Sequence, residues 1–215
     1  MRRILVTEPI HEDGIALLSA REDIEVIQTN NSEPATLAKL LPGSHGIAVR
    51  TAKLNAELLK LAPELQIVSR HGVGCDNLDV EYLTKRGIPI AIAAGANSTS
   101  VAELTFAMVL TLTRRIRELD KAVRNHDFGA RSRLLACELE GKFMLILGFG
   151  RIGQKVAARA RAFGMSVGVA DVDPDHAVAE KLGCQVVSDF RTELCNTDVL
   201  SIHVPLNETT HHIVS

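Results

Sequence analysis

Short apolar runs alternate with amphipathic segments along the first half of the chain. The runs predict strands at 4–6, 24–27, 46–49, 67–69 and 88–93, and the segments between them predict helices at 14–20, 34–41, 55–61 and 80–85. The strands are apolar at successive positions, which is typical of strands that are buried on both faces. The pattern therefore predicts an α/β domain in which helices cover both faces of a parallel sheet.

A longer helical pattern begins after Asn97. Ser100 and Glu103 have the spacing of a capping box, with Ser100 as the N-cap. Apolar residues then recur every three or four positions and predict one face of a helix about seven turns long: Val101, Leu104, Met108, Leu112, Ile116, Leu119 and Val123. The first half is apolar nearly all round, so we expect this helix to bridge two domains and to have apolar surface for a second subunit.

A second α/β series follows an irregular polar segment. It predicts strands at 143–147, 166–170, 185–187 and 199–204, with helices at 151–163 and 175–182 and a helical turn at 190–195. We therefore divide the chain into two domains, residues 1–98 and 99–215.

Composition and charge remove several classes of partner. The chain has 24 Lys and Arg against 26 Asp and Glu, a net charge of −2, so no strong field attracts nucleic acid or an anionic membrane. Aromatic residues are 3% of the chain and Trp is absent, which argues against a stacking platform for single-stranded nucleic acid. No apolar stretch approaches the ~20 residues of a membrane span.

The four cysteines have no metal-binding or redox spacing. Cys75, Cys137, Cys184 and Cys195 form no C-x-x-C pair, so we predict reduced thiols in a cytoplasmic protein. We predict no metal site.

The segment 148–153 carries the clearest chemical motif. It reads G-x-G-x-x-G, and it lies between a predicted strand and a predicted helix. Asp171 follows 18 residues after Gly153, at the end of the next predicted strand. Together these features make the full dinucleotide-binding fingerprint.

Each part of the fingerprint has a physical task. Gly148 permits a tight turn, Gly150 allows a pyrophosphate to approach the backbone, and Gly153 allows the helix to pack closely on the strand. The helix N-terminus offers N–H groups to the phosphates. The Asp171 carboxylate can accept both ribose hydroxyls and would repel a 2′-phosphate, so we predict NAD rather than NADP.

Other interpretations of these residues stay open. The glycines could form a turn that packs and binds nothing. Asp171 could be a capping or surface carboxylate, with Asp173 and Asp175 as competing candidates for the ribose.

Motifs along the whole chain resemble those of the D-isomer-specific 2-hydroxyacid dehydrogenases, particularly the branch around D-3-phosphoglycerate dehydrogenase. The matching segments are 49–51, 69–77, 86–89, 97–103, 148–153, 162–165, Asp171 and 203–206. The resemblance implies a flavodoxin-like substrate domain followed by a Rossmann NAD-binding domain that is incomplete at its C-terminal end. It also implies a homodimer.

The resemblance assigns binding roles to particular residues. Arg50 lies near the acidic groups of the substrate, although its position also suits a surface arginine, and the loop after the fourth strand holds the substrate carboxylate. The implied substrate-binding residues are Arg50, Arg70, Gly72, Val73 and Gly74, and the implied cofactor-binding residues are Gly148, Gly150, Arg151, Ile152, Gly153, Asp171, Val204 and Pro205.

The resemblance implies an NAD-dependent oxidoreductase. Its family transfers hydride between nicotinamide and a small 2-hydroxy or 2-keto acid, either 3-phosphoglycerate-like or similar to hydroxypyruvate and glyoxylate. The family's catalytic Arg, Glu and His lie beyond the stretch that matches Ser215, so we assign no catalytic residue and expect the chain alone to be inactive. The alternative is a non-catalytic NAD-binding or interaction protein with the same fold.

Overall fold

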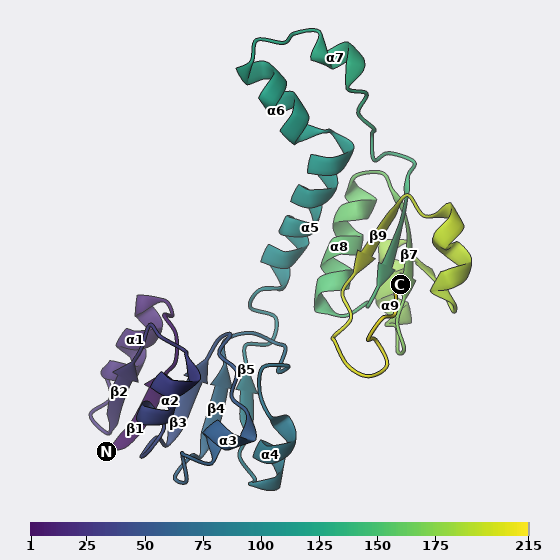
Figure 1. The fold of residues 1–215 in the computed structure, drawn as a ribbon. Coiled ribbons are helices and arrows are strands. Elements are labelled where there is room, and N and C mark those ends of the chain that lie inside the picture. Colours follow the sequence, from purple (N-terminus) through teal and green to yellow (C-terminus); the bar gives the residue numbers. More distant parts are fainter. Residues whose placement is uncertain (215) are drawn as a thin grey trace. The chain divides into compact units, whose positions relative to one another are not determined.

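A computed structural model describes residues 1–214, and the chain divides into two compact units, Met1–Ala96 and Asn97–Ser215 (Figure 1). The first unit alternates strands and helices: β1 (Arg2–Val6), α1 (Glu12–Ser19), β2 (Ile24–Gln28), α2 (Pro34–Leu40), β3 (Gly46–Val49), α3 (Ala56–Leu59), β4 (Ile67–Arg70), α4 (Val80–Lys85) and β5 (Ile90–Ile92). Its strands are parallel in the order β2-β1-β3-β4-β5, which is the flavodoxin-like order.

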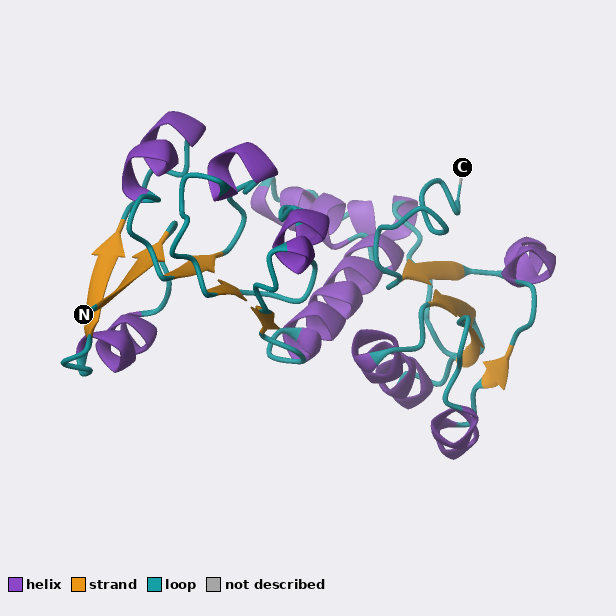
Figure 2. Ribbon diagram, turned by 90° about the horizontal axis from the view of Figure 1, so that it is seen from below, coloured by secondary structure: helices purple, strands orange, loops and turns teal. Residues whose placement is uncertain are grey.

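Helices cover both faces of the first sheet, as the apolar strands predict (Figure 2). Leu5, Ile47 and Val68 come from three adjacent strands and are at most 2% exposed in one apolar cluster. Side chains cap the N-termini of two short helices. Asn55 accepts from the Leu58 N–H at the start of α3, and Asp79 accepts from the Tyr82 N–H at the start of α4.

The second unit begins with three helices and continues as a second parallel sheet. Its elements are α5 (Ser98–Thr113), α6 (Ile116–Arg124), α7 (Ala130–Arg133), β6 (Phe143–Leu147), α8 (Arg151–Ala162), β7 (Ser166–Ala170), α9 (His176–Leu182), β8 (Gln185–Val186), the 3₁₀ helix η1 (Phe190–Asn196) and β9 (Val199–Ile202). The strand order is β8-β7-β6-β9, which corresponds to the 3-2-1-4 part of the Rossmann order.

β6 is the central strand of this sheet and is buried on both faces. Met144 and Ile146 lie in one apolar cluster with side chains of α5, α8 and α9. Leu145 and Leu147 point the other way, into a cluster with Phe190. This alternation explains why an uninterrupted apolar run forms a strand here.

The predicted seven-turn helix is wrong, because the chain breaks it into α5 and α6. Arg115 adopts a left-handed conformation with φ 51°. The Thr113 hydroxyl donates back to the Val109 carbonyl, and the Thr113 carbonyl accepts the N–H of Cys137 instead of one from its own helix. A polar contact from a later segment thus ends the helix without disturbing the apolar periodicity.

The predicted capping box is also wrong. The helix begins at Ser98, so Ser100 lies inside it, and Glu103 lies 3.7 Å from Arg159 of α8. Because α5 is apolar nearly all round, periodicity alone does not identify its buried face. Ala102, Phe106 and Val109 are buried, and Phe106 stacks on Phe163 with 5.2 Å between ring centroids. The apolar residues that recur every three or four positions are largely exposed, at Leu104, Met108, Leu112, Ile116 and Val123.

Candidate functional site

The turn from β6 into α8 brings three stretches of backbone into close contact. Gly148 has φ +93°, and a Cβ there would lie 2.7 Å from the carbonyl carbon and oxygen of His203, at the end of β9. A Cβ on Gly153 would overlap the carbonyl oxygen of Gly148. Neither position can hold a side chain unless the backbone moves.

Gly150 differs from these two glycines because space remains beside it. No atom lies within 4 Å of the position a Cβ would take. Gly150 is also the N-cap of α8, and no side chain caps this helix. The first-turn N–H groups have no partner within the helix, so they and the helix dipole face a gap that an anion can fill.

Asp171 is fixed beside the same turn. It follows β7, and its carboxylate accepts from the Phe149 N–H at 2.5 Å and from the Asp173 N–H at 3.2 Å. A carboxylate has about four acceptor positions, so it retains capacity for further donors. Of the two competing carboxylates, Asp175 caps α9 through the Val178 N–H, and Asp173 does not line the cavity described next.

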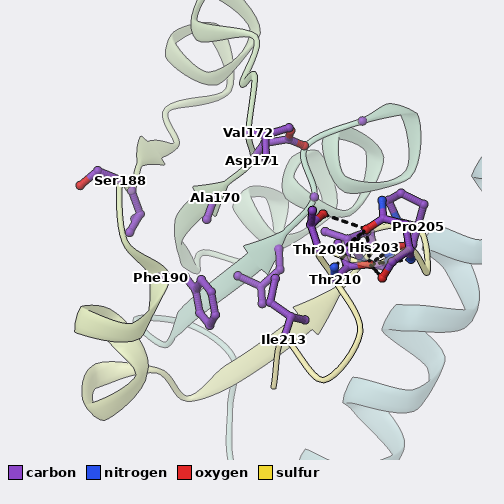
Figure 3. A pocket seen from close by; sticks show the side chains of 16 residues that line it. Ala170, Asp171, Val172, Ser188, Phe190, His203, Pro205, Thr209, Thr210 and Ile213 are labelled. Atoms are coloured by element: carbon purple, nitrogen blue, oxygen red, sulfur yellow. Dashed lines mark hydrogen bonds between the residues drawn. The ribbon is translucent and has the colours of Figure 1, made fainter. Parts of the chain in front are cut away.

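A cavity of about 410 Å³ lies at the carboxyl ends of the strands (Figure 3). Phe190 and Ile213 contribute to its apolar wall, and Asp171 is one of its polar lining residues. The lining residues are Leu147, Gly148, Gly150, Ala170, Asp171, Val172, Val187, Ser188, Phe190, His203, Val204, Pro205, Asn207, Thr209, Thr210 and Ile213. The cavity lies where the strand order reverses between β6 and β9, which is the usual position for ligands in open α/β sheets.

His203 is a polar group in the wall of this cavity. Its Nε2 lies 2.8 Å from the Ser201 Oγ, and burial lowers the pKa of its imidazole. The ring is therefore neutral at pH 7 and is suited to hydrogen bonding rather than to pairing with an anion.

The structure brings together most of the predicted cofactor residues. Gly148, Gly150, Asp171, Val204 and Pro205 line the cavity, whereas Arg151, Ile152 and Gly153 form the first turn of α8 beside it. The wall formed by Asn207, Thr209, Thr210 and Ile213 was not predicted from the sequence. These residues follow Pro205 in an irregular segment, so no periodicity marks them.

The predicted substrate residues follow neighbouring strands of the first unit. Arg50 comes after β3, and Arg70 ends β4, where it pairs with Val49. The Arg70 Nη1 donates to the His71 carbonyl at 2.6 Å and lies over Gly72, where a Cβ would overlap it. Val73 and Gly74 are exposed in the same loop.

Glu8 is a further residue at this edge, and it was not predicted from the sequence. Its carboxylate accepts N–H groups from Arg50, Thr51 and Ala52 and the Thr51 hydroxyl. Burial raises the pKa of Glu8, but these hydrogen bonds outweigh burial and lower the pKa to about 2. A single Glu after a strand gives no sequence signal for such a network.

Comparison with known proteins decides the family. Residues 106–215 match the family model described as "D-isomer specific 2-hydroxyacid dehydrogenase, NAD binding domain". The chain is 34% identical over 215 residues to the hydroxypyruvate reductase of Thermotoga maritima, covering 99% of this chain and 68% of that protein. The chain belongs to the D-isomer-specific 2-hydroxyacid dehydrogenase family.

Other family members are similarly related over nearly the whole chain. The D-3-phosphoglycerate dehydrogenase of Methanocaldococcus jannaschii is 37% identical over 215 residues, covering 100% of this chain and 40% of that protein. The structure of D-lactate dehydrogenase from Aquifex aeolicus complexed with NAD and lactic acid matches with a TM-score of 0.84 and 32% identity, over 99% of this chain and 63% of that chain. The 215 residues thus span only part of the length of these relatives.

The family assignment explains the second unit in particular. Its strands carry the first four positions of a Rossmann sheet, and its glycine turn lies within the matched NAD-binding domain. Among residues 1–214, no group of three or more His, Cys, Asp or Glu side chains could hold a metal ion. No helix in that range has the length and apolar character needed to cross a membrane.

The three glycines of the turn should respond differently to the same substitution. We expect Gly148→Ala and Gly153→Ala to destabilise the second unit by several kcal/mol, because each new methyl meets backbone. Gly150→Ala should stay within about 1 kcal/mol of wild type, because its methyl enters open space. Urea unfolding followed by circular dichroism measures the difference, and equal losses at all three positions would contradict this geometry.

Proposed function

We propose that this chain supplies the NAD-binding and substrate-binding parts of an NAD-dependent D-2-hydroxyacid dehydrogenase. The observation that carries the proposal is the empty space beside the Gly150 backbone, next to the Asp171 carboxylate, which the Phe149 N–H holds in place. NAD, when bound, accepts or donates the hydride. The protein's reaction would be hydride transfer between nicotinamide and a small 2-hydroxy or 2-keto acid.

The residues around the cavity of the second unit fit the parts of NAD. The N–H groups at the start of α8, including those of Arg151 and Ile152, suit the pyrophosphate. Asp171 has free acceptor positions for the ribose hydroxyls and would repel a 2′-phosphate. Val204 and Pro205 contribute apolar surface beneath the adenosine.

The first unit would bind the substrate, and the second would bind NAD. Arg50 follows β3 and Arg70 ends the adjacent strand β4, and both suit a carboxylate or phosphate. The N–H groups of Val73 and Gly74 add further donors, whereas the Gly72 N–H already donates to the Arg70 carbonyl at 2.8 Å. We infer a short anionic hydroxy or keto acid, either 3-phosphoglycerate-like or similar to glyoxylate and hydroxypyruvate. The names of the family members cover these substrates.

No catalytic residue is assigned within the described chain. A family reaction requires a His that exchanges the hydroxyl proton with help from a Glu. Among residues 1–214, the only His within 4.0 Å of a carboxylate is His11, which pairs with Asp13 at the exposed start of α1. His203 instead contacts Ser201. We therefore infer that the 215 residues alone bind NAD without turning over substrate, and this observation also supports a non-catalytic NAD-binding protein as a second candidate.

We also propose a cytoplasmic homodimer. Leu104, Met108 and Leu112 of α5 and Val123 of α6 are more than half exposed, and Phe128 and Leu135 continue the apolar surface beyond α6. Large apolar side chains exposed in such number along one segment are typical of a subunit interface. The free thiols of the four cysteines support a reducing compartment.

Calorimetry of the chain with NAD tests the cofactor site. We expect wild type to bind NAD and Gly150→Ala to bind at least tenfold more weakly, because the methyl fills the space for the pyrophosphate. Asp171→Ala should weaken NAD binding by about 10–100-fold and narrow the preference for NAD over NADP. Wild-type affinity in a folded Gly150→Ala variant would overturn the site.

An absorbance assay at 340 nm tests the absence of catalytic residues. The 215-residue chain should bind NADH but not oxidise it with glyoxylate or hydroxypyruvate, because no His–carboxylate pair lies at either site. A longer form that supplies the family's Arg, Glu and His should turn over. Turnover by the 215 residues alone would refute the inference that they lack the catalytic groups. If longer forms are also inactive, the non-catalytic candidate is favoured.

Sedimentation velocity tests the dimer. We expect wild type to sediment as a dimer and Leu112→Asp to shift it to monomer, because a buried unpaired charge is costly at an interface. Leu17→Asp is a matched control, since Leu17 of α1 is 74% exposed and Leu112 is 77% exposed. A monomeric wild type, or equal responses of the two variants, would refute the assignment.

A further inference from the structure

Glu8 connects two loops at the point where the strand order of the first sheet reverses. It follows β1, and it reaches the loop after the adjacent strand β3. Its carboxylate accepts the N–H of Arg50 at 2.8 Å, of Thr51 at 2.8 Å and of Ala52 at 3.1 Å, and also accepts the Thr51 hydroxyl. The residue is only 9% exposed.

Three successive N–H groups directed at one point form a nest that binds anions. In this loop the anion is a side chain of the protein itself. Among residues 1–214, Glu8 has no cation within 4.0 Å, so N–H and O–H dipoles alone stabilise its charge. The nest is therefore already filled and is not open to a substrate anion.

The same contacts connect the β3 loop to the glycine loop after β4. The Ala52 N–H binds Glu8, and the Ala52 carbonyl accepts from the Asn77 Nδ2 at 2.8 Å. The Leu54 N–H donates to the Asn77 carbonyl at 2.9 Å. These hydrogen bonds link Glu8 through the β3 loop to Asn77, which lies at the end of the glycine loop.

We propose that Glu8 is a positioning residue for substrate binding: it fills the N–H nest of residues 50–52 and so fixes the direction in which the Arg50 side chain leaves the loop. The inference rests on the proposed function, because it assigns Arg50 to the substrate anion. With the nest filled, that anion is bound by the Arg50 guanidinium and by the N–H groups of Val73 and Gly74, since the Gly72 N–H donates to the Arg70 carbonyl.

Emptying the nest and refilling it tests the inference. Glu8→Ala removes the internal anion, and formate supplies a carboxylate small enough to take its place. In nuclear magnetic resonance spectra of the full 215-residue chain, the amide signals of Arg50, Thr51 and Ala52 should move in Glu8→Ala and return on addition of formate. Glu25→Ala removes an exposed carboxylate of β2 in the same unit and should change none of these signals.

The substrate role needs a separate readout. We expect the affinity for 3-phosphoglycerate, measured from the amide shifts of residues 72–74, to fall about tenfold in Glu8→Ala. Formate, at a concentration that leaves wild-type affinity unchanged, should restore most of this loss. Glu8→Gln keeps the size of the side chain but replaces one acceptor with a donor, so it should give an intermediate loss if Glu8→Ala does not fold.

The outcomes separate the two claims. If wild type binds 3-phosphoglycerate and Arg50→Ala weakens it, unchanged binding in folded Glu8→Ala or Glu8→Gln overturns the positioning role alone. A variant that loses stability but keeps its affinity for 3-phosphoglycerate also overturns the positioning role, because a carboxylate with only a structural role would give that result. If wild type and Arg50→Ala show no binding, the substrate assignment of Arg50 fails, and the positioning role fails with it.

Discussion

The second unit depends on how closely its backbone approaches itself at the end of β6. Gly148 lies against the carbonyl of His203, and Gly153 lies against the carbonyl of Gly148. These contacts bring the start of α8 and the ends of β7 and β9 to one cavity. The cavity therefore results from main-chain packing, and Asp171 is the one carboxylate among the described polar side chains that line it.

The first unit also has N–H donors at the point where its strand order reverses. This reversal lies between β1 and β3, but a charged side chain occupies the donors exposed there. In the second unit the start of α8 has no capping side chain and remains open. The start of α8 is therefore open to an anion, whereas the donors of the β3 loop are already occupied.

Local sequence predicted the elements well where burial alone determines them. The strands of both sheets follow from apolar runs such as Phe143–Leu147, and the glycine turn and Asp171 follow from spacing. The break at Arg115 could not be predicted, because the contact between the Thr113 carbonyl and the Cys137 N–H joins segments far apart in the sequence. Glu8 and the wall from Asn207 to Ile213 were missed for the same reason, since each acts through partners that only the fold brings near.

The proposed function depends on NAD binding at the open start of α8. The most direct measurement is a titration of the isotope-labelled chain with NAD, followed through every backbone amide. We expect the largest shifts at Gly150–Gly153, Asp171 and the residues after β9. Saturable shifts confined to other parts of the chain, or none in a folded sample, would contradict this binding site.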